Sequence, residues 1–252
     1  MPSESPVEVF ADVNLKGSVV IVAFPTTGSA GSIAAQYLIR NLSLPLVGHL
    51  RLPDLVGLVA IQDGIVTSAV RIFGGEVVCK IGKECPSIYV VTTELALPPP
   101  VLNHLAEAVM HWAARGEAHM LLVLEGVGRA EGDDIPDVFA AAADAKVLKM
   151  LVKAGIPPME RALIAGITAQ ILLEAPARGV KAGGLLVEAS RDHPDGRAAA
   201  ALIEAVARMV PDVAVDAKPL LKEAMALEKE IKNAQSRTEM VANVKAPDQT
   251  FI

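Results

Sequence analysis

The sequence predicts an α/β protein in which a mainly parallel central sheet is flanked by helices and followed by a long C-terminal helix. Strand-like and helix-like segments alternate along most of the 252 residues. The strand-like segments are short aliphatic runs, and aromatic residues make up only 3% of the chain, which is typical of strands buried on both faces. Near the N-terminus a strand, a glycine-rich turn and a helix follow one another, as in many α/β domains.

The strands are predicted from short runs of Val, Ile and Leu that end at turn residues. The pair Asp63-Gly64 joins two of these runs and predicts a hairpin, which would add an antiparallel part to the sheet. The predicted strands are 7–12, 18–23, 55–62, 65–73, 76–81, 87–92, 119–125 and 185–188.

The helices are predicted from apolar residues spaced three and four apart. The first follows the glycine-rich turn and runs to about Asn41. In the last and longest helix, Leu220, Leu227 and Ile231 belong to a heptad-like seam. We expect this seam to pack against its own domain or against a sister subunit. The other predicted helices are 101–114, 145–154, one that ends at Arg178, and 197–209.

These elements predict three parts of the chain. Residues 1–218 are expected to form a single α/β domain, which is large enough to bury a substantial core. Residues 219–244 are expected to form the C-terminal helix, and residues 245–252 a flexible tail.

The glycine-rich turn is the first candidate site. It contains Thr26, Thr27, Gly28, Ser29 and Gly31, and it precedes a helix whose first backbone amides could bind an anion. The turn lacks the lysine of a P-loop and the first glycine of a dinucleotide-binding fingerprint. Alternatively, the glycines allow a tight turn and close packing of the helix on the strand. The residues favour this packing interpretation.

The remaining polar residues form no recognisable catalytic or metal-binding pattern. The five histidines lack the spacing of a zinc-binding helix. Asp195 is predicted to cap a helix, and the acidic residues 131–134 are expected in a solvated loop. Cys79 and Cys85 are expected to be free thiols. We therefore expect no metal, no cofactor and no catalytic residue.

The charge of the chain argues against several classes of partner. The net charge is −6 and the isoelectric point is about 5.4, with Lys and Arg scattered among acidic residues. This pattern predicts binding neither to nucleic acid nor to an anionic membrane surface. The N-terminus lacks the basic start and apolar core of a signal peptide, and no apolar run approaches the ~20 residues of a membrane span. We expect a cytoplasmic protein.

A series of short motifs follows in a fixed order along the chain. The motifs are Phe24-Pro25-x-x-Gly28-x-x-Gly31 with Ala34, Leu38 and Ile39; Ala165-Gly166-Ile167 with Leu172-Leu173-Glu174; Arg178-Gly179; Leu186-Val187-Glu188; His193-Pro194-Asp195-x-Arg197-Ala198-Ala199; and Leu220-Leu221-x-x-Ala224. Taken together, this series resembles the PAC2 family, the proteasome-assembly-chaperone family, over about residues 8–235.

The resemblance implies an α/β sandwich related to nucleoside-phosphorylase-like folds, and a homo-oligomer as in archaeal and bacterial members. It also implies a role in assembly of the proteasome core particle, where such members insert a C-terminal hydrophobic-Tyr-x tail between α-subunits. This chain ends in Thr250-Phe251-Ile252, so Phe251 supplies the ring without the hydroxyl. The carboxylate of Ile252 would pair with a lysine. Alternatively, this end of the chain is simply unordered.

We therefore expect a non-enzymatic chaperone-like protein that binds α-subunits of a 20S core particle through its C-terminal tail. One alternative is a nucleotide-binding or small-ligand-binding enzyme that uses the glycine-rich turn. An ATP-dependent carboxylate–amine ligase is an example, because members of the family have carried that label. Another alternative is that oligomerisation through the seam of the last helix is itself the function.

Overall fold

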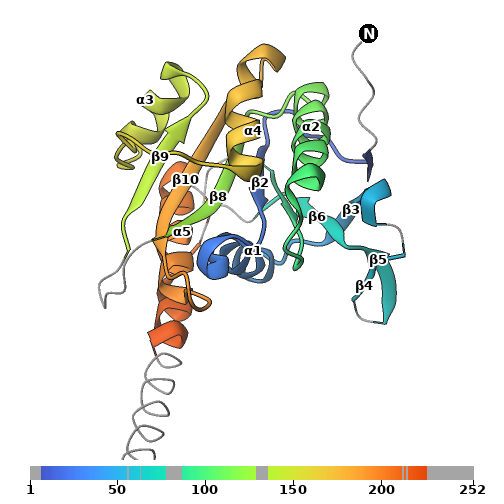
Figure 1. Ribbon diagram of the computed structural model, residues 1–252, viewed down its shortest axis with the longest axis horizontal. Coiled ribbons are helices and arrows are strands. Elements are labelled where there is room, and N and C mark those ends of the chain that lie inside the picture. Colours follow the sequence, from blue (N-terminus) through green and yellow to red (C-terminus); the bar gives the residue numbers. More distant parts are fainter. Residues whose placement is uncertain are drawn as a thin grey trace, which may run out of the picture.

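The computed structural model describes residues 7–55, 57–62, 64–77, 87–128, 136–211, 213 and 215–225 (Figure 1). Within these ranges an eight-stranded sheet forms the centre, in the order β1-β3-β6-β7-β2-β8-β10-β9, and β4 and β5 form a separate hairpin. The strands are β1 (Glu8–Ala11), β2 (Val19–Ala23), β3 (Leu46–Arg51), β4 (Val59–Gln62), β5 (Ile65–Ser68), β6 (Val70–Gly75), β7 (Ile88–Thr92), β8 (Met120–Gly128), β9 (Val138–Ala142) and β10 (Ala182–Ala189).

The expectation of a mainly parallel sheet is wrong, because the sheet is mixed. The four central strands β7, β2, β8 and β10 are parallel to one another. On one side β6, β3 and β1 continue the sheet in antiparallel pairs, and on the other side β9 is antiparallel to β10. Two of these antiparallel strands, β3 and β9, were absent from the sequence prediction. The nucleoside-phosphorylase-like relationship stays a prediction.

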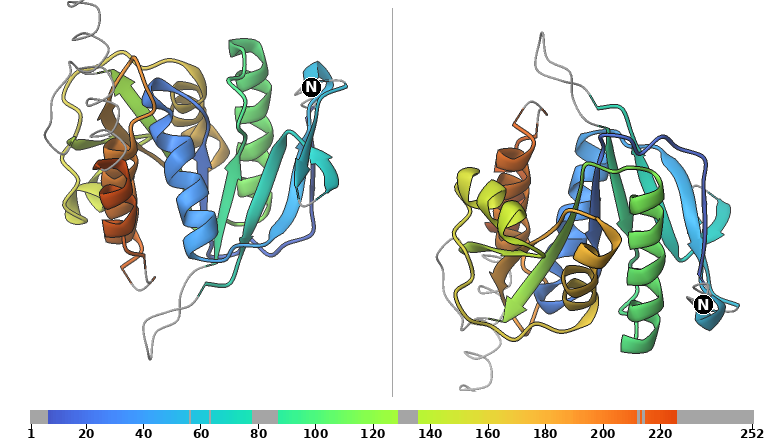
Figure 2. Two further views of the ribbon diagram at one scale, coloured as in Figure 1. Left: turned by 90° about the horizontal axis from the view of Figure 1, so that it is seen from below. Right: turned by 90° about the horizontal axis from the view of Figure 1, so that it is seen from above.

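Helices cover both faces of the sheet, as expected. Figure 2 shows α1 and α5 side by side on one face and α2 and α4 on the other, and α3 packs on the same face as α1 and α5. The helices are α1 (Ala30–Asn41), α2 (Pro99–Arg115), α3 (Ala145–Lys153), α4 (Gly166–Glu174) and α5 (Gly196–Met209), with short 3₁₀ turns η1 (Thr27–Ser29), η2 (Pro53–Leu55) and η3 (Ala175–Arg178).

The central strands are apolar along their whole length because both of their faces are buried. In β8, Leu122 and Leu124 belong to the core beneath α1 and α5, whereas Leu121 and Val123 belong to the core beneath α2 and α4. All four side chains are almost completely buried. A strand in this position requires aliphatic residues at successive positions rather than at every second one.

The region around the hairpin departs from the predicted boundaries. The run predicted as one strand at 65–73 is divided at Ala69 into β5, which pairs with β4, and β6, which joins the main sheet. Glu76 and Val77 lie outside any strand, and the rest of the strand predicted at 76–81 lies outside the described residues. Figure 1 shows the hairpin at the edge of the molecule beside β3.

The described part of the C-terminal helix, residues 218–225, packs on its own domain. Leu220 and Ala224 are buried, and Leu220 belongs to the core beneath α1 and α5. A Cβ atom added to Gly196 would lie only 2.6 Å from the Cβ of Ala224, so the helix lies directly against the start of α5. The rest of the helix predicted at 219–244, including Leu227 and Ile231, lies outside the described residues.

Candidate functional site

The glycine-rich turn lies at the carboxyl end of β2 and contacts the ends of β8 and β10. Thr26 precedes the 3₁₀ turn η1, and α1 begins directly afterwards at Ala30. Gly28 and Ser29 both have a positive φ, of 61° and 49°, which reverses the chain between strand and helix. Ligands of open α/β sheets often bind at this end of the parallel strands, and therefore the surroundings of the turn decide what it can do.

Both glycines of the turn are in close contact with neighbouring backbone. A Cβ atom added to Gly31 would lie 2.3 Å from the carbonyl oxygen of Leu124 in β8. A Cβ atom added to Gly28 would lie 3.0 Å from the Cβ of Ala189 and 3.0 Å from the carbonyl oxygen of Ser190. Both positions therefore need glycine because helix and strands approach too closely for a side chain.

Asp195 connects this turn to the start of α5. Its backbone N–H donates to the carbonyl of Gly28 at 2.8 Å. Its carboxylate accepts from the backbone N–H of Ser190 at 3.0 Å and of Ala198 at 2.9 Å. The predicted N-cap role of Asp195 is thus confirmed. Because the side chain is buried, the same carboxylate also fixes the loop that follows β10.

The polar groups of the turn form hydrogen bonds within the protein. The backbone N–H of Ser29 donates to the carbonyl of Thr26 at 2.9 Å, and that of Ala30 donates to the carbonyl of Thr27. The hydroxyl of Thr26 accepts from the backbone N–H of Gly126 in β8 at 3.3 Å. Two amides that an anion would need are therefore occupied, which supports the packing interpretation of the turn. Anion binding there remains an untested prediction.

Glu125, the residue before Gly126, is the most unusual titratable group near the turn. Burial raises the pKa of its carboxyl group above the ordinary 4.5, and the neighbouring hydroxyl of Thr168 in α4 offsets part of this rise. Oε2 of Glu125 and Oγ1 of Thr168 are both buried, and neither has a hydrogen bond of good geometry with the described residues. The pair is a polar defect in the apolar layer between β8 and α4.

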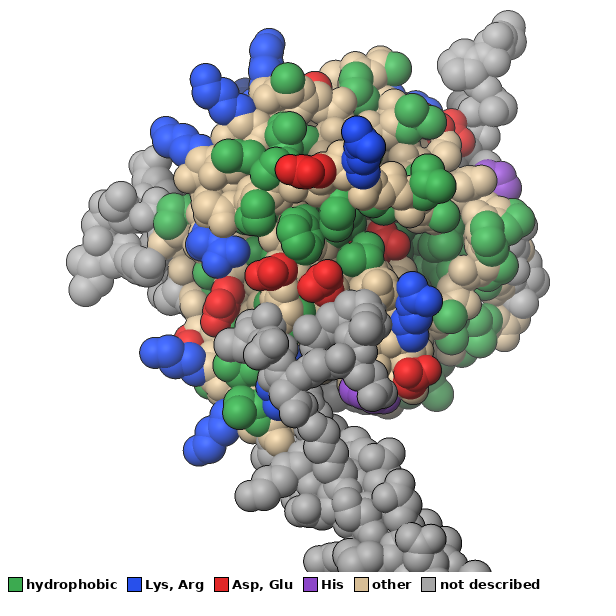
Figure 3. Space-filling view, turned by 60° about the vertical axis from the view of Figure 1, so that its left-hand side comes forward, with side chains coloured by type: hydrophobic (Ala, Val, Ile, Leu, Met, Phe, Trp, Pro, Cys, Tyr) green, Lys and Arg blue, Asp and Glu red, His purple; other side chains and the backbone are tan. Residues whose placement is uncertain are grey.

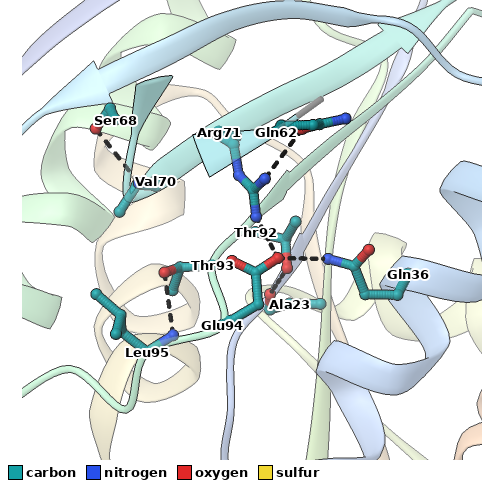
Figure 4. A network of polar contacts seen from close by, with 10 residues as sticks. All are labelled: Ala23, Gln36, Gln62, Ser68, Val70, Arg71, Thr92, Thr93, Glu94 and Leu95. Carbon is teal, nitrogen blue, oxygen red and sulfur yellow. Dashed lines mark hydrogen bonds and ion pairs between the residues drawn. The ribbon is translucent and has the colours of Figure 1, made fainter. Parts of the chain in front are cut away.

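A second polar cluster lies on the other side of the turn, where β6 and β7 meet α1 (Figure 4). The guanidinium group of Arg71 is buried, contacts the carboxylate of Glu94 and donates to Oε1 of Gln62 in β4 at 3.0 Å. Glu94 also accepts from Nε2 of Gln36 in α1 at 3.1 Å. Arg71 further lies 5.5 Å from the ring centre of Phe73. This cluster attaches the β4–β5 hairpin to the body of the protein.

The other predicted candidates are either structural or outside the described residues. Nδ1 of His193 lies 3.1 Å from the carbonyl oxygen of the adjacent Pro194. The part of the chain that the structure describes contains no group of three or more His, Cys, Asp or Glu side chains arranged to hold a metal ion. The predicted sites outside the described residues are Cys79, Cys85, the loop 131–134, and Thr250, Phe251 and Ile252.

The surface shows no stripe of a single charge on the side that Figure 3 displays. Blue Lys and Arg side chains, red Asp and Glu side chains and green hydrophobic side chains are interspersed there. This mixture fits the scattered basic residues of the sequence. Among the helices that the structure describes, none is both long enough and apolar enough to cross a membrane.

Comparison with known proteins places this architecture in a family. A model of the PAC2 family matches residues 20–235. The chain belongs to the PAC2 family. The match includes the glycine-rich turn, the Asp195 loop and the start of the C-terminal helix, so the resemblance noted in the sequence motifs is confirmed. In this PAC2 protein those motifs are the segments that join α1, α5 and the C-terminal helix to the sheet.

Several proteins are similar to this PAC2 protein over almost its whole length. An uncharacterised protein of Methanocaldococcus jannaschii is 26% identical over 222 residues, covering 88% of this chain and 87% of that protein. Pyrococcus furiosus PbaA, an archaeal homolog of proteasome-assembly chaperone, has a TM-score of 0.81 and 26% identity, covering 94% of this chain and 95% of PbaA. Pyrococcus furiosus PbaB, an archaeal proteasome activator, shares the fold with a TM-score of 0.78 and 18% identity, covering 92% of this chain and 100% of PbaB.

Sequence reasoning missed the Glu125–Thr168 pair and the Arg71 cluster. Each had a signal, because Arg71 and Glu125 are single charged residues within otherwise apolar strand segments. Such a residue indicates either a surface position or a buried partner. The partners Thr168 and Glu94 are far away in the sequence, so only the fold identifies them.

The first prediction concerns the conformation and packing of Gly28. We expect Gly28→Ala to destabilise the protein by about 2–4 kcal/mol. Alanine disfavours the positive φ at this position, and its Cβ atom would lie too close to the end of β10. The matched control is Gly179→Ala, which has φ 68° but open space around it, and should cost only about 1–2 kcal/mol. Urea unfolding measures both values. Equal losses would show that packing at Gly28 is unimportant.

The second prediction compares two helix caps. Asp195→Ala should cost about 2–4 kcal/mol, because the α5 cap is lost and the buried N–H of Ser190 loses its acceptor. Asp144→Ala removes the exposed cap of α3, whose carboxylate accepts from Lys146 and Val147, and should cost about 1 kcal/mol. Thermal and urea unfolding provide the comparison. A smaller loss for Asp195→Ala than for Asp144→Ala would contradict the dual role of Asp195.

The third prediction concerns the pH dependence that Glu125 causes. Its raised pKa means that the folded protein favours the protonated carboxyl group. Glu125 therefore contributes stability below pH 4.5 that is lost as the pH rises through the raised pKa. Glu125→Gln, which stays neutral, should melt at a higher temperature than the parent at pH 7–8 and similarly at about pH 4. An unchanged difference across this range, or the same behaviour in the exposed control Glu160→Gln, would contradict the assignment.

Proposed function

We propose that this PAC2 protein is a non-enzymatic assembly chaperone that binds α-subunits of a 20S proteasome core particle. The observation that carries the proposal is the match to PbaA, an archaeal homolog of proteasome-assembly chaperone, over nearly the full length of both chains. At 26% identity the two proteins can differ in their partners, so the binding partner has to be tested directly.

The geometry of the glycine-rich turn supports a binding surface elsewhere on the molecule. Gly28, Gly31 and Asp195 lie in the family match and serve to pack helices on the sheet. A nucleotide-dependent ligase is the less favoured alternative, because the amides of Ser29 and Ala30 that would face a phosphate already donate within the turn. The residues most suited to contact a partner are then those outside this closely packed joint.

The C-terminal residues are the proposed contact with the proteasome. The start of their segment is held on the domain by the buried side chains of Leu220 and Ala224. Phe251 offers an aromatic ring, and Ile252 offers a carboxylate. Buried aromatic anchors contribute a large share of binding energy in many interfaces, and a carboxylate pairs readily with a lysine. This chemistry suits a narrow apolar pocket with a basic residue at its end.

The fourth prediction tests this contact with purified α-subunits. Phe251→Ala, or deletion of residues 250–252, should weaken binding by about 10- to 100-fold, because the aromatic anchor is lost. Phe251→Tyr keeps the ring and adds a hydroxyl, so it should bind at least as tightly as the parent. Co-sedimentation and a fluorescence titration with labelled protein measure these affinities.

Two results would separate the parts of this proposal. Binding of the full chain that is unaffected by all three tail variants would refute the role of the tail and keep the α-subunits as partners. Absence of binding by the full chain, at concentrations where the purified α-subunits are folded, would refute the proposed function itself.

A further inference from the structure

The carboxyl ends of β2 and β7 form a topological switch point of the sheet. The two strands are adjacent and parallel. From β2 the chain continues into α1 on one face of the sheet, and from β7 it continues into α2 on the opposite face (Figure 2). In open α/β sheets, ligands commonly bind outside the carboxyl ends of the strands at such a point. Because the glycine-rich turn at the end of β2 serves packing, the polar side chains near the end of β7 are the groups that could bind a ligand here.

The cluster around Arg71 lies at this switch point (Figure 4). Arg71 in β6 pairs with Thr92, the last residue of β7. The hydroxyl of Thr92 donates to the carbonyl of Ala23, the last residue of β2, at 2.8 Å. Glu94 follows β7, and Nε2 of Gln36 in α1 donates to its carboxylate at 3.1 Å. The guanidinium group of Arg71 is thus a buried positive charge beside the carboxyl ends of both strands.

Arg71 and its partner Glu94 differ strongly in exposure. The side chain of Arg71 is 7% exposed, whereas that of Glu94 is 57% exposed. A buried guanidinium group needs an anionic partner, because an unpaired charge in the interior is strongly unfavourable. An exposed carboxylate gains little from an ion pair, because water solvates it well. Glu94 can therefore leave Arg71 at little cost when another anion takes its place.

Glu94 uses only part of the hydrogen-bonding capacity of Arg71. Nη2 of Arg71 contacts Oε1 of Glu94, and Nη1 donates to Oε1 of Gln62 at 3.0 Å. Nε of Arg71 is buried and has no hydrogen-bond partner among the residues that the structure describes. Nε and Nη2 lie on the same edge of the planar guanidinium group, where a carboxylate can accept from both at once. The edge that faces Glu94 therefore has one donor left for an incoming carboxylate.

A second ion pair on the protein shows that burial distinguishes Arg71. Arg51 lies 3.4 Å from the carboxylate of Glu8 and 5.2 Å from the ring centre of Phe10. Arg71 similarly lies 5.5 Å from the ring centre of Phe73. The side chains of Arg51 and Glu8 are 71% and 59% exposed, so water satisfies both of them. The same three side-chain types thus form an ordinary surface pair at Arg51 and a buried, incompletely paired cation at Arg71.

We propose that Arg71 binds the carboxylate of a small organic acid, and that Glu94 occupies this position when the acid is absent. The bound carboxylate accepts from Nε and Nη2 of Arg71 and from Nε2 of Gln36, while Glu94 turns into water. Gln62 keeps its contact with Nη1. The space that becomes free is that of one glutamate side chain, so short acids such as glutarate match it. The inference is independent of the proposed proteasome binding, because it involves none of residues 250–252.

The fifth prediction tests this site with glutarate, and neutral glutaramide serves as the matched compound. Glutarate should bind the parent protein with a Kd on the order of 1 mM, and at ten times this concentration it should raise the Tm by about 3–6 °C. Glu94→Ala removes the tethered competitor, so the Kd should fall about 10-fold. Glutaramide should shift neither protein. Calorimetric titration and thermal unfolding at constant ionic strength measure these effects.

Two further variants separate this site from general anion binding. Glu8→Ala removes the carboxylate of the exposed pair and should leave the Kd for glutarate unchanged. Arg71→Lys keeps the charge but lacks the two-donor edge, so its Kd should rise about 10-fold or more. Circular dichroism verifies the fold of each variant, and the comparison of Glu94→Ala with Glu8→Ala holds even if Arg71→Lys is unfolded. Absence of glutarate binding, or equal tightening by Glu94→Ala and Glu8→Ala, would overturn the proposal.

Inorganic phosphate and NMR complete the test. Phosphate that binds where glutarate does not would refute a carboxylate as the ligand. In the parent protein, glutarate should shift the Nε–H resonance of Arg71 by NMR, because Nε gains an acceptor, and should leave the Nε–H resonance of Arg51 in place. An unchanged Arg71 resonance at saturating glutarate would locate the bound acid elsewhere and refute the site.

Discussion

Helix α1 lies so close to β8 that no side chain fits between them at Gly31, and the rest of the fold depends on this approach. At this contact the backbone of α1 at Gly31 meets the backbone of β8 directly. A Cβ atom on Gly31 would overlap the carbonyl oxygen of Leu124. It sets the position of the turn at Gly28, whose carbonyl receives the N–H of Asp195. Asp195 in turn caps α5, against which the C-terminal helix packs. One close approach thus places three helices on one face of the sheet.

This constraint explains how a turn with the outline of an anion site packs a helix on the sheet. The same positive φ angles and helix N-terminus that suit a phosphate also allow a strand and a helix to meet at van der Waals distance. Here the amides of Ser29 and Ala30 donate to carbonyls of the turn itself, and the backbone N–H of Gly126 in β8 donates to the Thr26 hydroxyl. Of the two chemistries that such a turn permits, the surrounding strands leave room mainly for packing. The proposed function therefore relies on surfaces outside this turn.

The sequence predicted the strands whose own residues indicate burial on both faces. It missed strands that form only by pairing with distant segments of the chain. Aliphatic runs identified the central strands because both faces of β2 and β8 are covered. The alanines of β9 favour a helix in isolation, and only pairing with β10 makes them a strand. In β3, Gly48 weakens the strand signal, yet it is needed because a Cβ there would lie 2.5 Å from the carbonyl of Phe10. The motifs of the candidate site were visible in the sequence, but the partners of Arg71 and Glu125 could be identified only from the three-dimensional fold.

The β4–β5 hairpin departs from the rule that a half-buried strand turns its apolar residues toward its own core. The run 55–62, followed by Asp63-Gly64, correctly predicts a strand at β4, but Val59 and Ile61 point away from the body, opposite to the apolar residues of a strand packed on its own core. A slip of one residue would bury Val59 and Ile61 and expose Gln62. The buried guanidinium of Arg71 prevents this slip, because it would lose the acceptor Gln62 and leave a buried donor unpaired. The buried charge thus keeps an apolar face exposed to water, and contiguous exposed apolar patches often mark interaction sites.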